Sequence, residues 1–301
     1  MNCPLCNGKN IIVLETINKT DIVIVYRKML DIDVSYLINQ DIDFCECQNC
    51  KLRFYNPLIT GDEKFYNSLQ KFDWYYMDDK EEYQYAKKFI SPNDKVLEVG
   101  SGKGAFAKHL ATKDYIGLDL SQNAKEMAAK NGINIENEMI QDYALKHKEE
   151  FDIVVSFQVL EHVSDPKSFI EAKLYALKKG GKLIIAVPSE VSFLKYVTNG
   201  ILNMPPHHVT RWSDATFEYI ASKYELNIET IYHEKVQDVH KRWYLHTLVF
   251  NSLCGYKHIS TSIFTKVVSK FSSLLSRLLV RGLKNEMLPN GHTVLVVYRK
   301  K

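Results

Sequence analysis

A run of closely spaced glycines after an apolar stretch is the strongest chemical signal in the sequence. Residues 96–99 are mostly apolar and lead into Gly100, Gly102 and Gly104. Glycines at this spacing let the backbone approach a ligand closely, and the amides that open a following helix face that ligand. The motif therefore predicts a site for a cofactor that carries a nucleoside. It also fits a loose dinucleotide-binding pattern, Gly100-x-Gly102-x-x-Ala105, so the spacing alone leaves the cofactor open.

An acidic residue stands where the ribose of such a cofactor would be held. Asp119 ends the second strand-like run, nineteen residues after Gly100. A carboxylate at this place can accept hydrogen bonds from ribose hydroxyls. A phosphate-binding loop is excluded because no Gly-Lys-Ser/Thr follows the glycines. A nicotinamide-dependent oxidoreductase predicts a Tyr-x-x-x-Lys or comparable pair for hydride transfer, and none follows the fourth predicted strand in a convincing place.

Cysteines mark a second site, near the N-terminus. Five of the six cysteines fall within the first 50 residues, and four form Cys-x-x-Cys pairs: Cys3 with Cys6, and Cys47 with Cys50. Thiolates at this spacing suit tetrahedral Zn²⁺, and four of them leave no open position, so the ion would be structural. Cys45 leaves a second ligand set open, because Cys45-x-Cys47 could replace a pair. Free thiols and a redox-active pair are the alternatives, and the redox interpretation lacks its usual βαβ context.

The overall composition is that of an ordinary globular chain. Its 301 residues are 46% hydrophobic and 25% charged, which excludes the disordered, collagen-like and coiled-coil classes. The formal net charge of +3 produces no general attraction for nucleic acid, so a nucleic-acid-binding module is disfavoured. Neither a signal-peptide pattern nor an uninterrupted apolar span is present. We therefore expect a cytoplasmic protein.

Apolar periodicity predicts the elements that position these motifs. From residue 94 to about 235, short apolar runs alternate with amphipathic stretches, as in βαβ units around a parallel sheet. Strands are predicted at 95–99, 115–118, 152–156, 182–187 and, near the C-terminus, 292–298. One predicted helix begins at Ser121 and ends at Gly132, and another begins at Asp165 and ends at Gly180.

Taken in order, these blocks resemble the class I S-adenosylmethionine-dependent methyltransferases. That family shows an acid two residues before the first glycine, an acid closing the second strand and an acid after the third, which correspond to Glu98, Asp119 and Asp142. Its fourth and fifth strand blocks are matched by residues 151–163 and 177–188. The resemblance implies an α/β fold with a Rossmann-like, mostly parallel seven-stranded sheet and helices on both faces.

The resemblance also implies how S-adenosylmethionine would be held. The acid after the second strand would bind the ribose, and residues after the third strand would surround the adenine. The glycine loop would pass under the methionine moiety, and the end of the fourth strand would line the wall near the sulfonium. Glu98 would contact the cofactor or tie loop amides. The cofactor-binding residues expected on this basis are Glu98, Gly100, Ser101, Gly102, Gly104, Asp119, Leu120, Asp142, Tyr143, Phe157 and Gln158.

A pair of histidines is the candidate for activating the methyl acceptor. Residues 203–213 contain a Pro-Pro-His-His turn, in a connection that lies over the acceptor site in the class I architecture. The turn resembles one in glycan-modifying relatives, where a histidine serves as general base for an alkyl hydroxyl. His208 is favoured slightly over His207, and structural hydrogen bonding is the alternative. Glu161 with His162 is a weaker acid–base candidate.

The resemblance implies a substrate class as well. The four-cysteine segment is similar to the zinc ribbon that precedes the catalytic domain in some bacterial methyltransferases of sugars and cell-surface glycans. We therefore expect methyl transfer to a hydroxyl of a sugar or cell-surface glycan precursor, with structural Zn²⁺ as a second bound group. C-methylation of a nucleotide-linked keto sugar is the alternative, although the Tyr-His-Glu-His type motif expected for it is missing.

Residues 262–285 form a basic amphipathic stretch. If the stretch is helical, its basic residues share one face and apolar residues occupy the other. The basic residues are Lys266, Lys270, Arg277, Arg281 and Lys284. Such a helix can lie on an anionic membrane surface, which predicts a peripheral contact with the inner membrane. A solvated face over a packed core, or a dimer helix, is the alternative, and the oligomeric state stays open.

Three parts are expected along the chain. They are a zinc-ribbon-like β module (1–56), an aromatic-rich helical connector (57–93), and a methyltransferase domain (94–301) with a helical insertion at about 236–288. Within the module, β-branched residues predict strands at 11–14 and 21–29. The aromatic residues of the connector include Trp74, Tyr75 and Tyr76.

Overall fold

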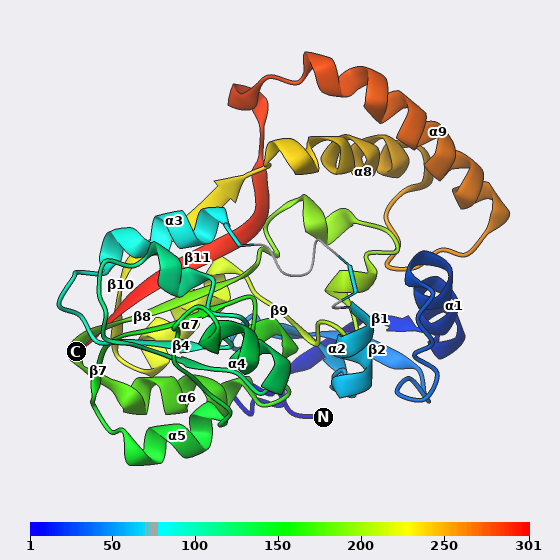
Figure 1. Ribbon diagram of the computed structural model, residues 1–301. Helices are drawn as coiled ribbons and strands as arrows, with labels where there is room; N and C mark the ends of the chain where they lie inside the picture. Colours follow the sequence, from blue (N-terminus) through cyan, green and yellow to red (C-terminus); the bar gives the residue numbers. More distant parts are fainter. Residues whose placement is uncertain (70, 73–77) are drawn as a thin grey trace.

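Two β-sheets of four and seven strands form the framework of the protein (Figure 1). The computed structural model describes residues 1–69, 71–72 and 78–301, apart from the side chain of Met287. Three of the aromatic residues predicted for the connector, Trp74, Tyr75 and Tyr76, lie outside the described residues.

The seven-stranded sheet has the order β10-β11-β8-β7-β4-β5-β6. The strands are β4 (Val96–Val99), β5 (Tyr115–Leu118), β6 (Ile135–Glu136), β7 (Phe151–Phe157), β8 (Leu177–Pro188), β10 (Leu226–Lys235) and β11 (Asn290–Lys300). Pairs among β4 to β8 are parallel, whereas β11 is antiparallel to both of its neighbours. The predicted Rossmann-like, mostly parallel sheet of seven strands is therefore confirmed.

Helices cover both faces of this sheet (Figure 1). They are α3 (Glu81–Ala86), α4 (Gln122–Ala129), α5 (Ile140–Lys146), α6 (Pro166–Ala176) and α7 (Asp214–Lys223). Val154 of β7 packs in one apolar cluster with Phe169 and Phe217, on the side of α6 and α7. Its neighbour Val155 packs in another cluster with Tyr83 of α3. Successive strand residues are thus buried on opposite faces, as expected for a covered parallel sheet.

Side-chain caps determine where the helices that follow the parallel strands begin. The Ser121 side chain accepts a hydrogen bond from the amide of Ala124 at the start of α4, as the sequence predicts. Asp165 likewise caps α6 through the amide of Ser168. This helix ends at Ala176 and not at the predicted Gly180, because β8 already begins at Leu177.

The smaller sheet joins the N-terminal segment to the rest of the chain. Its strands are β1 (Ile11–Ile17), β2 (Ile42–Cys47), β3 (Arg53–Asn56) and β9 (Thr210–Arg211), in that order and all antiparallel. The first three come from the N-terminal segment, but β9 belongs to the connection that follows β8. The Pro-Pro-His-His turn, which directly precedes β9, is therefore anchored by the N-terminal sheet.

Residues 21–29 do not form the predicted strand. They belong to the helix α1 (Lys19–Leu30), which the Asn18 side chain caps by accepting a hydrogen bond from the Thr20 amide. The residues Ile22, Val25 and Tyr26 are buried, and their spacing is that of one helix face. Packing of this face decides the structure, because the β-propensity of branched residues is weak and depends on context.

Two longer helices lie between β10 and β11, at the top of Figure 1 and away from the sheet. They are α8 (Lys241–Cys254) and α9 (Ile263–Leu279), and they pack against each other. The remaining helix is α2 (Glu63–Leu69), and the 3-10 turns are η1 (Lys87–Phe89), η2 (Phe106–His109), η3 (Leu160–His162), η4 (Phe193–Tyr196), η5 (Ile201–Asn203), η6 (Asp238–His240), η7 (Val280–Gly282) and η8 (Asn285–Met287). Among the described residues, no helix combines the length and the apolar character that crossing a membrane requires.

Candidate cofactor and acceptor site

A cleft of about 2370 Å³ opens at the carboxyl ends of the parallel strands. Open α/β sheets bind their ligands at this edge, where the loops after several strands meet. The structure brings nine of the predicted site residues to the cleft wall: Gly100, Ser101, Gly102, Asp119, Leu120, Phe157, Gln158, His207 and His208.

The backbone of the glycine loop lies so close to neighbouring side chains that a Cβ atom would not fit at Gly100. Gly100 has a φ of 77°, and a Cβ atom there would lie 2.3 Å from Cγ2 of Val159. Gly102 also has a positive φ, of 52°. These conformations favour glycine, which explains the motif in physical terms. The loop continues into the four-residue 3-10 turn η2 in place of the expected helix.

Asp119 is tied to this loop by its carboxylate. Oδ2 accepts a hydrogen bond of 2.7 Å from the amide of Gly102, and Oδ1 accepts one of 2.9 Å from the amide of Ser121. Burial raises the pKa of Asp119, and the two amide hydrogen bonds oppose that shift. Because a carboxylate offers about four acceptor positions, two positions remain for the hydroxyls of a ribose.

Two predicted cofactor residues near the loop do not line the cleft. Glu98 is buried inside the sheet, where it accepts a hydrogen bond from the hydroxyl of Tyr115. Burial raises the pKa of Glu98 to about 8. Gly104 packs against Ile133, whose Cγ2 atom would lie 2.7 Å from an added Cβ. Both residues therefore support the conformation of the glycine loop without lining the cleft.

The predicted adenine contacts also differ from the structure. The segment forms the helix α5 from Ile140 onward, so Asp142 is exposed in its first turn and Tyr143 is buried. The Tyr143 ring stacks on His147 at a centroid distance of 4.0 Å. Helical rotation turns Gln141 toward the cleft instead. The Oε1 atom of Gln141 is buried and has no hydrogen-bond partner among the described residues.

A cluster of three histidines lies on the cleft wall. His207 and His208 are buried, and their rings lie 4.6 and 4.7 Å from the ring of His162, between centroids. Oε1 of Glu161 lies 3.8 Å from Nε2 of His208 and 3.7 Å from Nε2 of His162. The turn η3 contributes Glu161 and His162, while the connection before β9 contributes the other two. Glu161 and His162 thus belong to the same group as the Pro-Pro-His-His turn.

Burial determines the charge state of this cluster. It lowers the pKa of His162 to about 4 and the pKa values of His207 and His208 well below their usual range. Neighbouring rings of the cluster further lower the pKa values of His207 and His208, so all three imidazoles are neutral at pH 7. Burial raises the pKa of the Glu161 carboxyl to about 8. Neutral imidazoles keep a lone pair that can accept a proton or bind a metal ion.

Tyr66 is a further cleft residue that sequence reasoning did not single out. It comes from α2, and its hydroxyl lies 3.2 Å from Nδ1 of His162. The only sequence signal was the aromatic-rich composition of the connector. That composition marks the region but not the residue.

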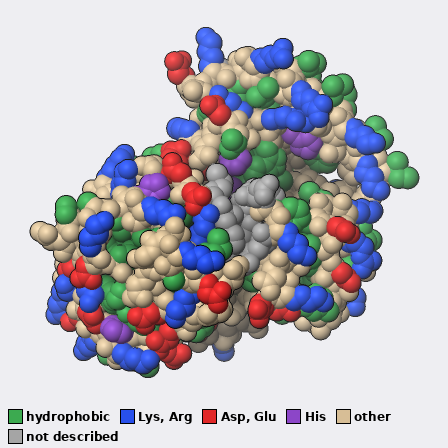
Figure 2. Space-filling model, viewed as in Figure 1, with side chains coloured by type: hydrophobic (Ala, Val, Ile, Leu, Met, Phe, Trp, Pro, Cys, Tyr) green, Lys and Arg blue, Asp and Glu red, His purple; other side chains and the backbone are tan. Residues whose placement is uncertain are grey.

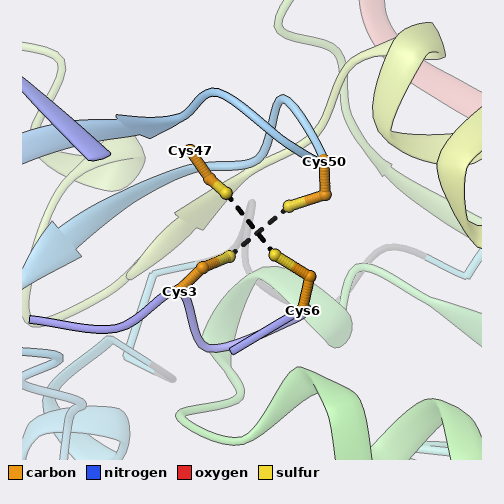
Figure 3. A group of neighbouring side chains, drawn as sticks. All are labelled: Cys3, Cys6, Cys47 and Cys50. Atoms are coloured by element: carbon orange, nitrogen blue, oxygen red, sulfur yellow. Dashed lines mark hydrogen bonds between the residues drawn. The ribbon is translucent and has the colours of Figure 1, made fainter. Parts of the chain in front are cut away.

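The four predicted zinc ligands converge on one point (Figure 3). The sulfur atoms of Cys3 and Cys50 are 3.4 Å apart, and those of Cys6 and Cys47 are 3.5 Å apart. All four sulfurs lie within 4.8 Å of one another, which suits Zn–S bonds of about 2.3 Å around a tetrahedral ion. Cys45 stays outside this group, because its sulfur faces that of Met1 at 3.5 Å.

The fold and the cleft together define a class I S-adenosylmethionine-dependent methyltransferase domain. The seven-stranded, mostly parallel sheet is the one that the resemblance to this class predicts, and the glycine loop lies in the cleft. The family model described as methyltransferase domain matches residues 73–231, and the chain belongs to this family.

Individual relatives match parts of the chain. An uncharacterized protein of Methanocaldococcus jannaschii is 39% identical over 115 residues, which are 38% of this chain and 54% of that protein. A ubiquinone biosynthesis O-methyltransferase of Salmonella newport is 36% identical over 100 residues, which are 31% of this chain and 41% of that enzyme. The matches span about half the length of these relatives. The solved structure of a SAM-dependent methyltransferase from Thermotoga maritima aligns with a TM-score of 0.50 and 21% identity, over 79% of this chain and 98% of that chain, which shows the common fold.

Proposed function

We propose that this protein transfers the methyl group of S-adenosylmethionine to a hydroxyl oxygen of a sugar or cell-surface glycan precursor. The contact of 3.8 Å between Nε2 of His208 and Oε1 of Glu161 carries the proposal, because it places polar groups able to activate a hydroxyl in the cofactor cleft. The similarity to a ubiquinone O-methyltransferase supports oxygen as the accepting atom.

The cofactor would supply the methyl group as the electrophilic substituent of a sulfonium. Asp119 would hold its ribose, and the backbone of Gly100 and Gly102 would pass close to its methionine moiety. We assign the adenine end to Gln141 and not to Asp142, because the buried Oε1 of Gln141 can accept a hydrogen bond from an amino group. Phe157 and Gln158 would line the wall between the two ends.

The acceptor hydroxyl is a poor nucleophile until its proton is removed. We assign the proton acceptor to His208, which is neutral at pH 7 and whose Nε2 faces the Glu161 carboxyl. As the hydroxyl oxygen forms a bond to the methyl carbon, the carbon–sulfur bond breaks and the proton passes to the imidazole. S-adenosylhomocysteine and the methyl ether are the products. Alignment of oxygen, carbon and sulfur then supplies most of the remaining rate enhancement.

The lining of the cleft supports a polar acceptor. Asn203, Glu234 and Gln237 line it in addition to the histidines, and such groups can hydrogen-bond a polyhydroxylated molecule. The size of the cleft leaves room for an acceptor larger than a single hexose beside the cofactor. These features favour a glycan precursor over a small apolar substrate.

We also propose that Cys3, Cys6, Cys47 and Cys50 bind a structural Zn²⁺ ion. The ion would join the first turn of the chain to the turn after β2 and so hold the sheet to which β9 adds. In this way it would support the position of the histidines without touching the substrate.

Product analysis tests the function. The protein is incubated with S-adenosylmethionine labelled in its methyl group and with nucleotide-linked hexoses, and the products are analysed by mass spectrometry and NMR. We expect an O-methyl signal. A methyl group on a carbon beside a carbonyl would instead support the C-methylation alternative. Labelled product on none of these sugars, with S-adenosylhomocysteine still bound, would contradict the substrate class.

A further inference from the structure

We infer that Glu161, His162, His207 and His208 form a binding site for a divalent metal ion in the cleft. The inference rests on the proposed function and refines it: the ion would bind the acceptor hydroxyl and lower its pKa, and the proton would pass to water, because Nε2 of His208 would bind the ion in place of a proton. The cysteine site described above is separate, because its ligands are thiolates.

The distances bring one nitrogen of each histidine together, and Oε1 of Glu161 faces two of the three rings. The ligand nitrogens of the three histidines lie within 4.8 Å of one another. Oε1 of Glu161 lies 3.7 and 3.8 Å from the Nε2 atoms of His162 and His208. Small side-chain rotations can bring such atoms to the contacts of about 2.0–2.2 Å that imidazole and carboxylate make to Zn²⁺.

The hydrogen bonds of the rings leave the Nε2 atoms as the ligand atoms. In each ring Nδ1 faces an oxygen that accepts a hydrogen bond, so the proton belongs on Nδ1 and the lone pair on Nε2. The Nδ1 contacts are 2.7 Å from His162 to the carbonyl of His207, 2.9 Å from His207 to the carbonyl of Leu202, and 3.4 Å from His208 to Oδ1 of Asn203. Metal-binding histidines are usually oriented by this kind of second hydrogen bond.

Without a cation, this group of buried acceptors is energetically unfavourable. Both carboxylate oxygens of Glu161 are buried and have no hydrogen-bond partner among the described residues. The Nε2 atoms of His162 and His208 face Oε1 of this carboxylate, and buried acceptors without a donor are unfavourable. A proton on Glu161 could satisfy one of these two nitrogens, whereas a metal ion would satisfy both nitrogens and the carboxylate. An ion with three imidazoles and one carboxylate belongs to the Zn²⁺, Fe²⁺ and Co²⁺ type, not to the Mg²⁺ or Ca²⁺ type.

Cobalt binding tests the site separately from the cysteines. The full chain, carrying Zn²⁺ at its thiolates, is titrated with Co²⁺ and followed by visible absorption and native mass spectrometry. We expect one Co²⁺ per chain, with weak ligand-field bands and without the intense near-ultraviolet bands of Co²⁺ bound to thiolates. The double variant His207→Ala, His208→Ala should lose this ion, and Glu161→Gln should bind it at least roughly tenfold more weakly.

The matched control is His246→Ala, which removes another histidine of the cleft, one hydrogen-bonded to Ser269 and outside the cluster. This control should keep the Co²⁺ ion, and calorimetric binding of S-adenosylhomocysteine should show that each variant is folded. No added ion in the wild type, thiolate bands on its addition, or an ion retained by the double variant would overturn the site. A bound ion in a protein that methylates no acceptor would reject the proposed function and leave the site standing.

The outer face of α9 carries a second, independent proposal: it binds a bilayer that contains anionic phospholipid. The helix turns its small residues inward, since Val268, Ser272 and Ser276 are its buried residues. Its large apolar residues point away from the protein and are 46–79% exposed: Ile263, Phe264, Val267, Phe271, Leu274, Leu278 and Leu279. The face that the alternative places over a packed core is thus exposed, and Figure 2 shows apolar and basic side chains together on this upper lobe.

The positive charge of this face favours an anionic bilayer as its binding partner. Five exposed basic residues, Lys266, Lys270, Arg277, Arg281 and Lys284, accompany the apolar residues, and residues 263–285 contain no acidic side chain. Two copies packed face to face would bring these like charges together. An anionic lipid surface would accept the apolar residues and neutralise the basic ones, at about 1 kcal/mol for each Lys or Arg near the surface.

Vesicle sedimentation tests this surface. We expect the protein to pellet with vesicles of phosphatidylglycerol and phosphatidylcholine but not with pure phosphatidylcholine. The variant Phe264→Ser, Phe271→Ser should lose binding at least tenfold, whereas Leu248→Ser, which removes an exposed apolar residue of α8, should not. Absence of binding to the anionic vesicles would overturn the proposal. So would a dimer, detected by ultracentrifugation, that the double serine variant abolishes.

Discussion

One carboxylate oxygen of Asp119 accepts a hydrogen bond of 2.7 Å from the backbone amide of Gly102. The acid that follows β5 and the glycine loop are therefore held together, although seventeen positions separate Asp119 from Gly102 in the sequence. Because β4 and β5 are parallel neighbours, the loop after one strand meets the acid that ends the next. A cofactor that binds both is held at the carboxyl edge of the sheet.

Replacement of Asp119 should abolish most cofactor binding. Asp119→Ala would remove the two charge-assisted hydrogen bonds proposed for the ribose and leave the loop amides unpaired, which together predict a loss of roughly 100-fold or more in affinity for S-adenosylhomocysteine. Isothermal titration calorimetry measures it. Asp142→Ala is the matched control, because Asp142 is exposed outside the cleft and its loss should leave the affinity unchanged. A loss of affinity in Asp142→Ala but not in Asp119→Ala would instead support Asp142 as a cofactor-binding residue.

Close packing of the glycine loop can be tested with a pair of alanine variants. Gly100→Ala adds a Cβ atom 2.3 Å from Val159 at a positive φ, and we expect it to destabilise the fold by about 2–4 kcal/mol. Gly132→Ala has a similar φ of 68° but meets nothing within 4 Å, so it should cost only about 1 kcal/mol. Comparing the free energies of unfolding of the two variants in urea separates the cost of the clash with Val159 from the cost of the positive φ. Equal losses would show that Val159 moves away without cost.

Glu98 should make stability depend on pH. Its pKa is raised to about 8 in the folded protein from 4.5, so between these pH values the folded state holds one proton more than the unfolded state. The free energy of unfolding must therefore fall as pH rises from about 4.5 to about 8, by at most about 1.4 kcal/mol per pH unit from this group. Glu98→Gln keeps an acceptor for the Tyr115 hydroxyl and removes the ionisation.

Urea unfolding at pH 5.5 and pH 8 measures the effect. We expect the variant to gain stability relative to the wild type at pH 8 and to gain much less at pH 5.5. An equal difference at both pH values would show that Glu98 is ionised in the folded protein. Affinity for S-adenosylhomocysteine should be unchanged in the variant, because Glu98 does not line the cleft.

Zinc binding should depend on four particular cysteines. Cys3→Ser with Cys6→Ser removes two ligands, and native mass spectrometry should show loss of the thiolate-bound Zn²⁺ and a lower midpoint of thermal unfolding. Cys45→Ser is the control, since its sulfur faces Met1 and not the other four. Loss of zinc in Cys45→Ser, with zinc retained in the double variant, would favour the alternative ligand set.

Local sequence patterns were sufficient for most of the large sheet. The apolar runs of β4, β5, β7 and β8, the glycine loop and the caps at Ser121 and Asp165 depend on residues close to one another in sequence. The same holds for the spacing of the cysteine pairs. Their structural meaning could therefore be predicted without knowledge of distant contacts.

The differences arise where distant segments or a helix boundary decide the outcome. Residues 21–29 are helical because their buried face packs against the segment that contains Ile201 and Met204. Asp142 turns to solvent because α5 begins at Ile140, a boundary that the sequence does not mark with a side-chain cap. The histidine cluster is of the same kind, since 45 positions separate His162 from His207 and only the fold brings them together.

The histidine cluster also yields the sharpest test of function. His208→Ala should lower turnover by roughly 100-fold or more while the affinity for S-adenosylhomocysteine stays within about twofold, because the role proposed for His208 is at the acceptor and not at the cofactor. The control His246→Ala removes a cleft histidine outside the cluster and should keep most of the activity. Steady-state kinetics with the unmethylated sugar acceptor found by the product analysis separate kcat from KM. If turnover of His208→Ala matches the wild type, the group that activates the acceptor lies elsewhere in the cleft, and the contact between His208 and Glu161 is only structural.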